Sequence, residues 1–205
     1  MADEQATVGA RNLSSGSTAN LRSDRTGALV TQNAHGRYTE AVLAGRVWLA
    51  SNQAGQATST GLSTTQTGFT LTNPAGSGVN IVLLQVCVAL TTAPAAAATL
   101  VLAANVNTAA AAVTQTTALT VRNALLGTGG TGNGLAASAV TLPAAPVVVR
   151  TIGGGPVGAV TLNTAYIMDE VDGGLILVPN TAISLSSITT AISGIFTFVW
   201  EEVIA

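Results

Sequence analysis

The chain has 205 residues, a formal net charge of −2, seven arginines, no lysine and one cysteine, Cys87. This length suits one domain with an additional tail. The composition excludes an intrachain disulfide, and without lysine it also excludes a Walker A loop and a Schiff-base mechanism. The balanced charge offers no basic face for nucleic acid, and no run approaches 18 uninterrupted apolar residues. We therefore expect neither nucleic acid nor membrane as a partner.

Charge is distributed unevenly along the chain. Residues 1–46 hold nine of the sixteen formal charges, whereas residues 47–121 hold none. The first segment also has few large apolar side chains and no sustained period, so it cannot offset its ordering entropy alone. It is either disordered or an extended arm that becomes ordered on a partner, and its dispersed polar residues favour the arm. We predict an N-terminal arm at 1–45 and a β-domain at 46–205. The candidate anchors in the arm are Arg11, Arg22, Asp24, Arg25, Arg37 and Tyr38.

After residue 46 the pattern is one of short β-type runs separated by turn residues. Strands are predicted at 46–50, 68–72, 80–91, 99–102 and 118–122. In the third of these, strict alternation places Val82 to Leu90 (even numbers) on one face and Ile81 to Ala89 (odd numbers) on the other. Both faces are fairly apolar, which indicates a central strand that is covered on both sides.

Five glycines in residues 127–134 predict a flexible or left-handed loop rather than a phosphate-binding one. Two short strands follow at 139–142 and 147–150, and 153–156 is predicted as a turn. The next strands are expected at 164–168 and 175–178, on either side of an acidic turn at 169–174. Further strands are predicted at 182–186 and 195–204. In the last one, three aromatic side chains share one face and are expected to seal the core: Phe196, Phe198 and Trp200.

About eight to ten strands without an amphipathic helix predict an all-β fold, an antiparallel β-sandwich or jelly roll. A parallel β-helix is the alternative, although the sequence shows no fixed internal period.

Few residues offer catalytic or metal-binding chemistry. The sole histidine, His35, lies in the predicted arm, far in sequence from Cys87, which we interpret as an inert buried thiol. The acidic turn contains Asp169, Glu170 and Asp172. A hard cation is conceivable there, but the spacing matches no EF-hand and a solvated turn is the better interpretation.

Two further carboxylates, Glu201 and Glu202, follow Trp200 near the end of the chain. We expect one of them to face solvent or to pair with an arginine, either Arg122 or Arg150. A two-carboxylate glycosidase remains open, but the chain has few aromatic platforms for a sugar. The sequence therefore predicts no enzyme, no cofactor and no bound metal.

Two parts of the chain resemble viral structural proteins. Residues 20–30 (Asn-Leu-Arg-Ser-Asp-Arg-Thr-Gly-Ala-Leu-Val) and 35–41 (His-Gly-Arg-Tyr-Thr-Glu-Ala) resemble the N-terminal segment of tailed-bacteriophage virion proteins. Residues 174–179 and 198–202 are similar to the closing strands of viral jelly-roll subunits. The resemblance implies a capsid decoration (cement) protein. Such proteins are commonly trimers that sit on junctions of the capsid protein, with arms that reach across neighbouring subunits.

These features lead to one functional expectation and two alternatives. The expected protein is made in the host cytoplasm without a signal peptide and is located on the capsid surface of the virion. Its expected partners are the major capsid protein and further copies of itself in a homotrimer. The first alternative is a receptor- or glycan-binding head or fibre tip that uses the glycine-rich loop. The second is a tail or neck component, with a symmetry other than three-fold.

Overall fold

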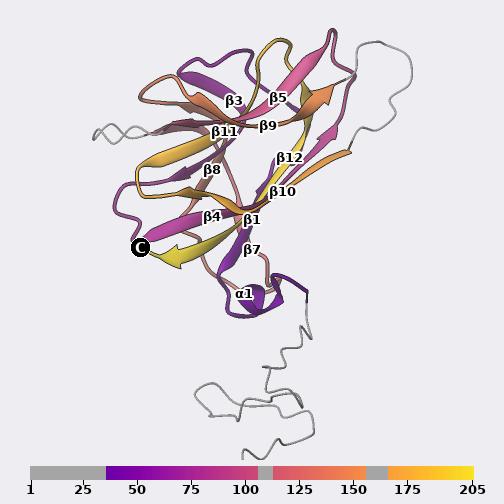
Figure 1. The fold of residues 1–205 in the computed structure, drawn as a ribbon. Helices are drawn as coiled ribbons and strands as arrows, with labels where there is room; N and C mark the ends of the chain where they lie inside the picture. Colours follow the sequence, from indigo (N-terminus) through magenta and orange to yellow (C-terminus); the bar gives the residue numbers. More distant parts are fainter. Residues whose placement is uncertain (1–35, 106–112, 156–165) are drawn as a thin grey trace, which may run out of the picture. The chain divides into compact units, whose positions relative to one another are not determined.

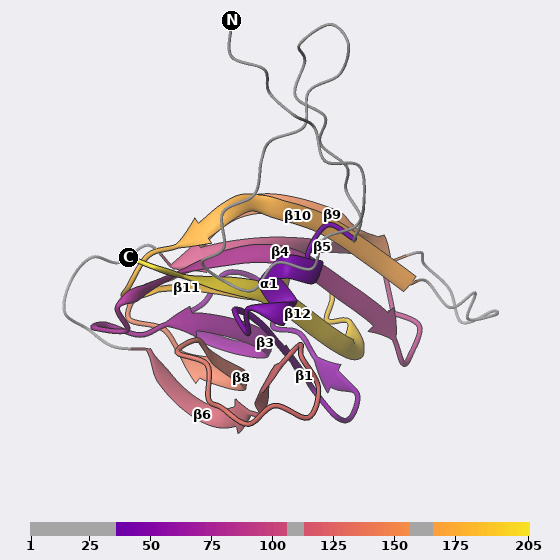
Figure 2. The same cartoon turned by 90° about the horizontal axis from the view of Figure 1, so that it is seen from below.

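The computed structural model describes residues 36–105, 113–155 and 166–205 (Figures 1 and 2). These ranges contain one short helix and twelve strands, so the predicted all-β class is confirmed. The chain divides into two compact units, residues 1–39 and 40–205. The predicted arm anchors Arg11, Arg22, Asp24 and Arg25 lie outside the described residues, as does His35. The boundary predicted after residue 45 stays a prediction.

The helix and strands occur in the following order. They are α1 (Thr39–Leu43), β1 (Val47–Ser51), β2 (Gln56–Ala57), β3 (Thr65–Asn73), β4 (Val79–Leu90), β5 (Ala98–Asn105), β6 (Thr114–Leu119), β7 (Val121–Asn123), β8 (Leu135–Thr141), β9 (Val147–Gly155), β10 (Tyr166–Leu177), β11 (Thr181–Ser187) and β12 (Ser193–Ile204). The short helix α1 was not expected from the sequence. It ends at Leu43, and Gly45, two residues later, has a φ of 72°, a left-handed conformation typical of the residues that follow a helix C-terminus. Within the described ranges, no helix combines the length and the hydropathy needed to cross a membrane.

The strands form two six-stranded antiparallel sheets. The first has the order β10-β4-β12-β1-β7, with β2 also paired to β12, and the second has the order β6-β8-β3-β11-β5-β9. Four antiparallel pairs are nested along the chain: β1 with β12, β3 with β11, β4 with β10 and β5 with β9. These pairs belong alternately to the two sheets, which is the wound antiparallel ribbon of a jelly roll. The inserted strands β6, β7 and β8 widen the sheets at one side.

The core lies between the two sheets, and both sheets contribute side chains to it. Phe196, Phe198 and Trp200 are fully buried, as the alternation in β12 predicted. The ring of Phe69, from β3 of the facing sheet, stacks on Phe198 with centroids 4.4 Å apart and planes 20° apart. Val, Ile and Leu side chains fill the remaining space, which suits the low aromatic content of the chain.

The strict alternation predicted for β4 is wrong at Leu84. Leu83 pairs with Trp200 and Gln85 pairs with Val199, so Leu84 has no partner across the ladder and forms a β-bulge. The extra residue shifts the two-residue period by one, so the core-facing side chains change from odd to even numbers. Cys87 consequently lies on the outer face and is only partly buried, which contradicts the prediction of a buried thiol.

Two predicted turns also lie inside strands. The acidic residues 169–174 belong to β10, and β9 continues through Gly153 and Gly154 to Gly155. Pairing between β10 and β4 shifts between Glu170 and Leu175. Within that shift Asp172 has a φ of 55° and Gly173 a φ of 80°. A bulge can absorb such left-handed residues without ending the strand, which a sequence pattern does not reveal.

Candidate functional site

The structure describes two of the predicted arm anchors, Arg37 and Tyr38. The guanidinium carbon of Arg37 lies 6.0 Å from the ring centroid of Tyr38, at the outer limit of a cation–π contact. Arg37 is exposed and Tyr38 is partly buried. Their role in capsid binding stays a prediction.

A buried carboxylate holds the glycine-rich loop. Glu202 is only 8% exposed, and its Oε2 atom accepts hydrogen bonds from the backbone N of Asn133 at 3.0 Å and from Asn133 Nδ2 at 2.9 Å. Its Oε1 atom accepts from the backbone N of Gly134 at 2.8 Å and from Trp200 Nε1 at 3.3 Å. Four donors of this kind compensate the lost hydration of a buried carboxylate. The loop is therefore tied to the core at its C-terminal end.

At two glycines of this loop, an added Cβ atom would lie so close to core side chains that those side chains would have to shift. A Cβ atom on Gly134 would lie 2.9 Å from Ile81 Cδ1 and 3.0 Å from Trp200 Nε1. A Cβ atom on Gly132 would lie 2.9 Å from Glu202 Oε1 and 3.0 Å from Trp48 Cδ2. Part of the glycine density thus serves close packing, whereas the sequence indicated only backbone freedom.

A groove of about 570 Å³ lies beside this loop. Its lining includes Arg46, Trp48, Asn133, Glu201 and Glu202. Arg46 Nε donates to Glu201 Oε1 at 2.8 Å. A C-terminal glutamate therefore does pair with an arginine, but the arginine is Arg46 and not Arg122 or Arg150 as expected. Both glutamates are already engaged, one in an ion pair and the other by the loop. The groove thus presents amide, carboxylate and guanidinium groups beside the largely buried ring of Trp48.

The partner of Arg150 is Asp169. Arg150 donates from Nε to Oδ2 at 2.8 Å and from Nη2 to Oδ1 at 2.9 Å, a bidentate pair. The hydrogen bond and the charge attraction raise the pKa of the Arg150 guanidinium above its ordinary value. The acidic segment is thus partly neutralised from within the protein. In the described parts of the chain, no three His, Cys, Asp or Glu side chains are grouped so as to hold a metal.

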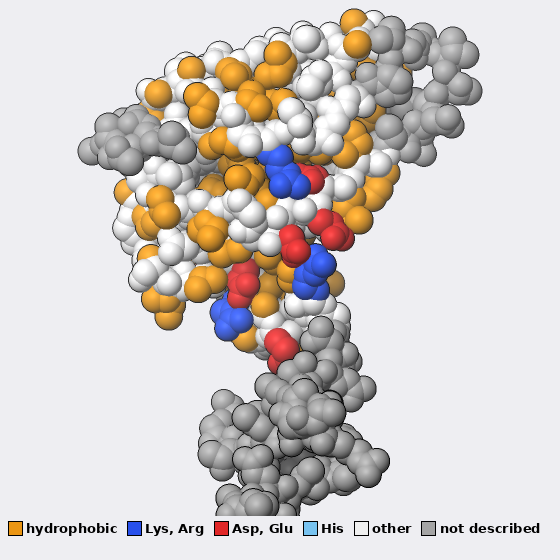
Figure 3. All heavy atoms as spheres, viewed as in Figure 1, with side chains coloured by type: hydrophobic (Ala, Val, Ile, Leu, Met, Phe, Trp, Pro, Cys, Tyr) orange, Lys and Arg blue, Asp and Glu red, His pale blue; other side chains and the backbone are white. Residues whose placement is uncertain are grey.

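Exposed apolar side chains gather where β9 and β10 lie next to each other. Among the described residues, seven of thirteen large exposed hydrophobic side chains lie on these strands or directly after β10. We call this surface the β9–β10 edge, and Figure 3 shows hydrophobic side chains spread over this side of the molecule, with arginine and acidic side chains gathered near its middle. An apolar groove of about 270 Å³ opens there. The seven residues are Val147, Val148, Val149, Tyr166, Met168, Ile176 and Val178.

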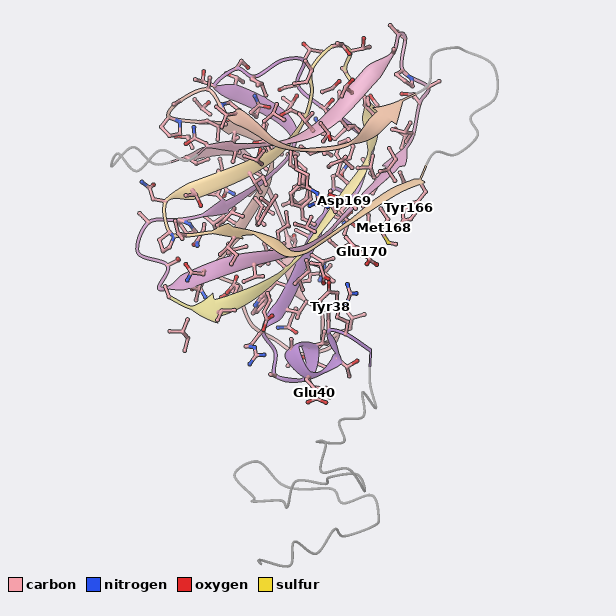
Figure 4. All side chains as sticks on the ribbon, in the orientation of Figure 1. Tyr38, Glu40, Tyr166, Met168, Asp169 and Glu170 are labelled. Atoms are coloured by element: carbon pink, nitrogen blue, oxygen red, sulfur yellow. The ribbon has the colours of Figure 1, made fainter. Side chains whose placement is uncertain are left out.

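Tyr166 and Met168 also take part in a small polar network on the outer face of the first sheet. Tyr166 donates from its hydroxyl to Cys87 Sγ at 3.4 Å, and Gln85 Nε2 donates to Met168 Sδ at 3.0 Å. The hydrogen bond to Cys87 raises the pKa of Tyr166. Tyr166 and Met168 alternate along β10 with Asp169, which pairs with Arg150 (Figure 4).

The chain was compared with protein families, curated proteins and solved structures, and no match was found in any of the three.

Proposed function

We propose that the protein is a structural virion protein, a cement protein that binds the outer surface of a tailed-phage capsid. The observation that carries this proposal is the difference in charge between residues 1–39 and residues 40–205. Residues 40–205 hold nine charged residues, and four of them form ion pairs with one another: Arg46 with Glu201 and Arg150 with Asp169. Residues 1–39 hold seven charged residues, including four arginines.

The two parts suit different contacts in such an assembly. A β-domain with few and paired charges can pack against neutral protein surfaces at little desolvation cost. The arginines of the N-terminal segment can make bidentate contacts with carboxylates on a partner. In this proposal Arg11, Arg22, Arg25, Arg37 and Tyr38 clamp adjacent capsid subunits, and Asp24 supports the clamp. A homotrimer of β-domains then strengthens the shell against the pressure of the packaged genome, without catalysis or a cofactor.

The test is binding to capsids after removal of two arm charges. Arg22→Ala with Arg25→Ala should lower the occupancy of purified protein on expanded capsids, while circular dichroism shows an unchanged β-domain. Arg46→Ala with Arg122→Ala is the matched control, because it removes the same charge from residues 40–205. Unchanged occupancy of the arm variant, or an equal loss in the control, would show that the arm is not the clamp.

A second candidate, a glycan-binding head, is favoured by the polar groove next to the glycine-rich loop. Asn133 and Glu201 line it, and side chains of these types form hydrogen bonds to sugar hydroxyls, whereas Trp48 also lines it but is only 8% exposed. This candidate predicts that the isolated protein binds host polysaccharide and that Asn133→Ala abolishes binding. Absence of binding to host cells and to their polysaccharides would eliminate it.

A further inference from the structure

The glycine-rich loop contains the only Asn–Gly pair of the chain, Asn133–Gly134. An asparagine in this context is prone to deamidation, because glycine has no side chain that keeps its backbone nitrogen away from the asparagine amide carbon. Asn133 is exposed, so water can reach it. Both reacting groups are nevertheless held by one buried carboxylate, that of Glu202. The site therefore combines a reactive sequence with a specific restraint.

Deamidation at this pair needs only water as a co-reactant. The backbone N of Gly134 loses its proton and attacks Cγ of Asn133, a C–N bond forms, and the bond from Cγ to Nδ2 breaks. Nδ2 departs as ammonia with the proton that left Gly134, and a cyclic succinimide remains. Water then opens the ring at either carbonyl and yields aspartate or isoaspartate at position 133. Nothing is oxidised or reduced in either step.

Glu202 engages both the attacking and the leaving nitrogen. Its Oε1 atom accepts the backbone N–H of Gly134 at 2.8 Å, and its Oε2 atom accepts Nδ2 of Asn133 at 2.9 Å. Removal of the proton from Gly134 would create a second negative charge beside the carboxylate, which is costly at a buried position. Ring closure would also break the hydrogen bond that anchors the asparagine side chain. The reaction therefore requires that the loop first detaches from Glu202.

Packing around Gly134 opposes the same movement. A Cβ atom on this glycine would lie 2.9 Å from Ile81 Cδ1 and 3.0 Å from Trp200 Nε1, so its backbone is in close contact with the core. The succinimide ring includes the backbone N of Gly134. Its formation therefore has to reshape the chain at a closely packed position.

The product of deamidation cannot restore the contact. Aspartate at position 133 would place a carboxylate oxygen where Nδ2 now donates to Glu202, and isoaspartate would also lengthen the backbone. Two carboxylates at this distance repel each other. We propose that Asn133 is a deamidation site that Glu202 restrains in the folded protein, and that its conversion permanently releases the glycine-rich loop. The inference goes beyond the proposed function and does not depend on it.

The experiment follows deamidation at position 133 in the full-length protein at mildly alkaline pH. Trypsin cuts after Arg122 and Arg150, so mass spectrometry of the peptide 123–150 reports the change from amide to carboxyl, and fragmentation locates it. The folded wild type should react at least about tenfold more slowly than the chain unfolded in urea, because the reaction requires local opening. Glu202→Gln should raise the rate towards that of the unfolded chain. The matched control Glu201→Gln changes the neighbouring carboxylate and should react like the wild type.

Circular dichroism establishes that each variant is folded. If Glu202→Gln is not, Glu202→Asp draws the carboxylate back by a methylene and should raise the rate in a folded protein. A folded wild type that reacts as fast as the unfolded chain overturns the inference. Equal rates in the Glu202 and Glu201 variants do so too, as does a slower reaction in Glu202→Gln, which would mean that the carboxylate promotes the reaction.

Asn133→Asp tests the consequence of the modification. Its midpoint of chemical denaturation should fall below that of Asn133→Ala, which removes the same donor without adding a charge next to Glu202. Equal midpoints for the two variants would overturn the proposed release of the loop.

Discussion

Arg150 and Asp169 join the two sheets of the jelly roll at the edge where each sheet ends. The guanidinium of Arg150 on β9 meets both carboxylate oxygens of Asp169 on β10, at 2.8 and 2.9 Å. Such a fork-to-fork contact fixes the relative position of two strands that share no backbone ladder. It also pairs two of the four charges on the described parts of β9 and β10 with each other. The pair therefore stabilises the contact between the two strands.

This relationship predicts a measurable coupling between the two residues. In a double-mutant cycle of Arg150→Ala and Asp169→Asn, the coupling free energy of unfolding should be about 1 kcal/mol, since the arginine is 38% exposed and partly screened by solvent. Because the pKa of Arg150 is raised in the folded protein, its contribution to the free energy of unfolding is fully present at any pH below the ordinary pKa of arginine. That contribution is lost only as the pH rises through the raised value. Urea unfolding near neutral pH is the measurement.

The ion pair between Arg46 and Glu201 is the control for this cycle. It has a single contact at 2.8 Å and its arginine is 53% exposed, so its coupling should be about 0.5 kcal/mol or less. Additive effects of Arg150→Ala and Asp169→Asn would contradict the proposed role of the bidentate pair.

Glu202 and Glu201 should respond very differently to the same substitution. Glu202→Gln replaces one acceptor oxygen by an amide donor, so at least one buried N–H of the loop loses its partner. We expect a loss of about 2 kcal/mol in the free energy of unfolding. Glu201→Gln affects only a surface ion pair and should cost less than about 1 kcal/mol. Chemical denaturation of both variants distinguishes them, and equal losses would show that the loop does not depend on Glu202.

Within the glycine-rich loop, Gly134 should be far more sensitive than Gly129. A methyl group on Gly134 would collide with Ile81 and Trp200, and the strain should lower the free energy of unfolding by about 1–3 kcal/mol. A Cβ atom on Gly129 meets nothing within 4 Å. Gly129→Ala should therefore be neutral or stabilise the fold by a few tenths of a kcal/mol. Thermal unfolding of the two alanine variants tests this, and a tolerated Gly134→Ala would mean that the loop is not packed as described.

The two tyrosines offer a test of the outer-face network. Tyr166 should ionise at a higher pH than an ordinary tyrosine, because its proton is held in the hydrogen bond to Cys87. Cys87→Ala removes that acceptor and should lower the pKa of Tyr166 towards its usual value. An ultraviolet absorbance titration reports the change, and Tyr38→Phe serves as the background so that one tyrosine titrates. An unchanged titration in Cys87→Ala would contradict the contact.

Composition and local patterning predicted much of the fold. The alternation of Phe196, Phe198 and Trp200 in β12 was visible in the sequence, and all three are fully buried. The β-class also followed from short Val, Thr and Ala runs between turn residues. Where the pattern failed, at Leu84 and around Asp172, the cause is a bulge. A bulge depends on how neighbouring strands pair, so the sequence of one strand alone does not predict it.

The contacts of the candidate surfaces were not predictable from the sequence in the same way. Glu202 lies 69 residues from Asn133, and Arg46 lies 155 residues from Glu201. No local pattern indicates which of several arginines will reach a given carboxylate, and the expected partners of the C-terminal glutamates were wrong for this reason. The capsid-binding residues in the arm remain predictions that rest on residue type and position.

The sequence by itself determined the fold class, the apolar face of the last strand and the uneven distribution of charge, because these depend on residue types and on spacing along one chain. The tertiary structure alone decided that β9 and β10, the terminal strands of the two sheets, lie side by side, that Arg150 meets Asp169 and that Glu202 holds the glycine-rich loop. Those contacts arise only when the nested antiparallel pairs wind into two sheets. Winding brings together residues that are far apart in sequence, and which residues meet depends on register, bulges and strand order rather than on any local preference.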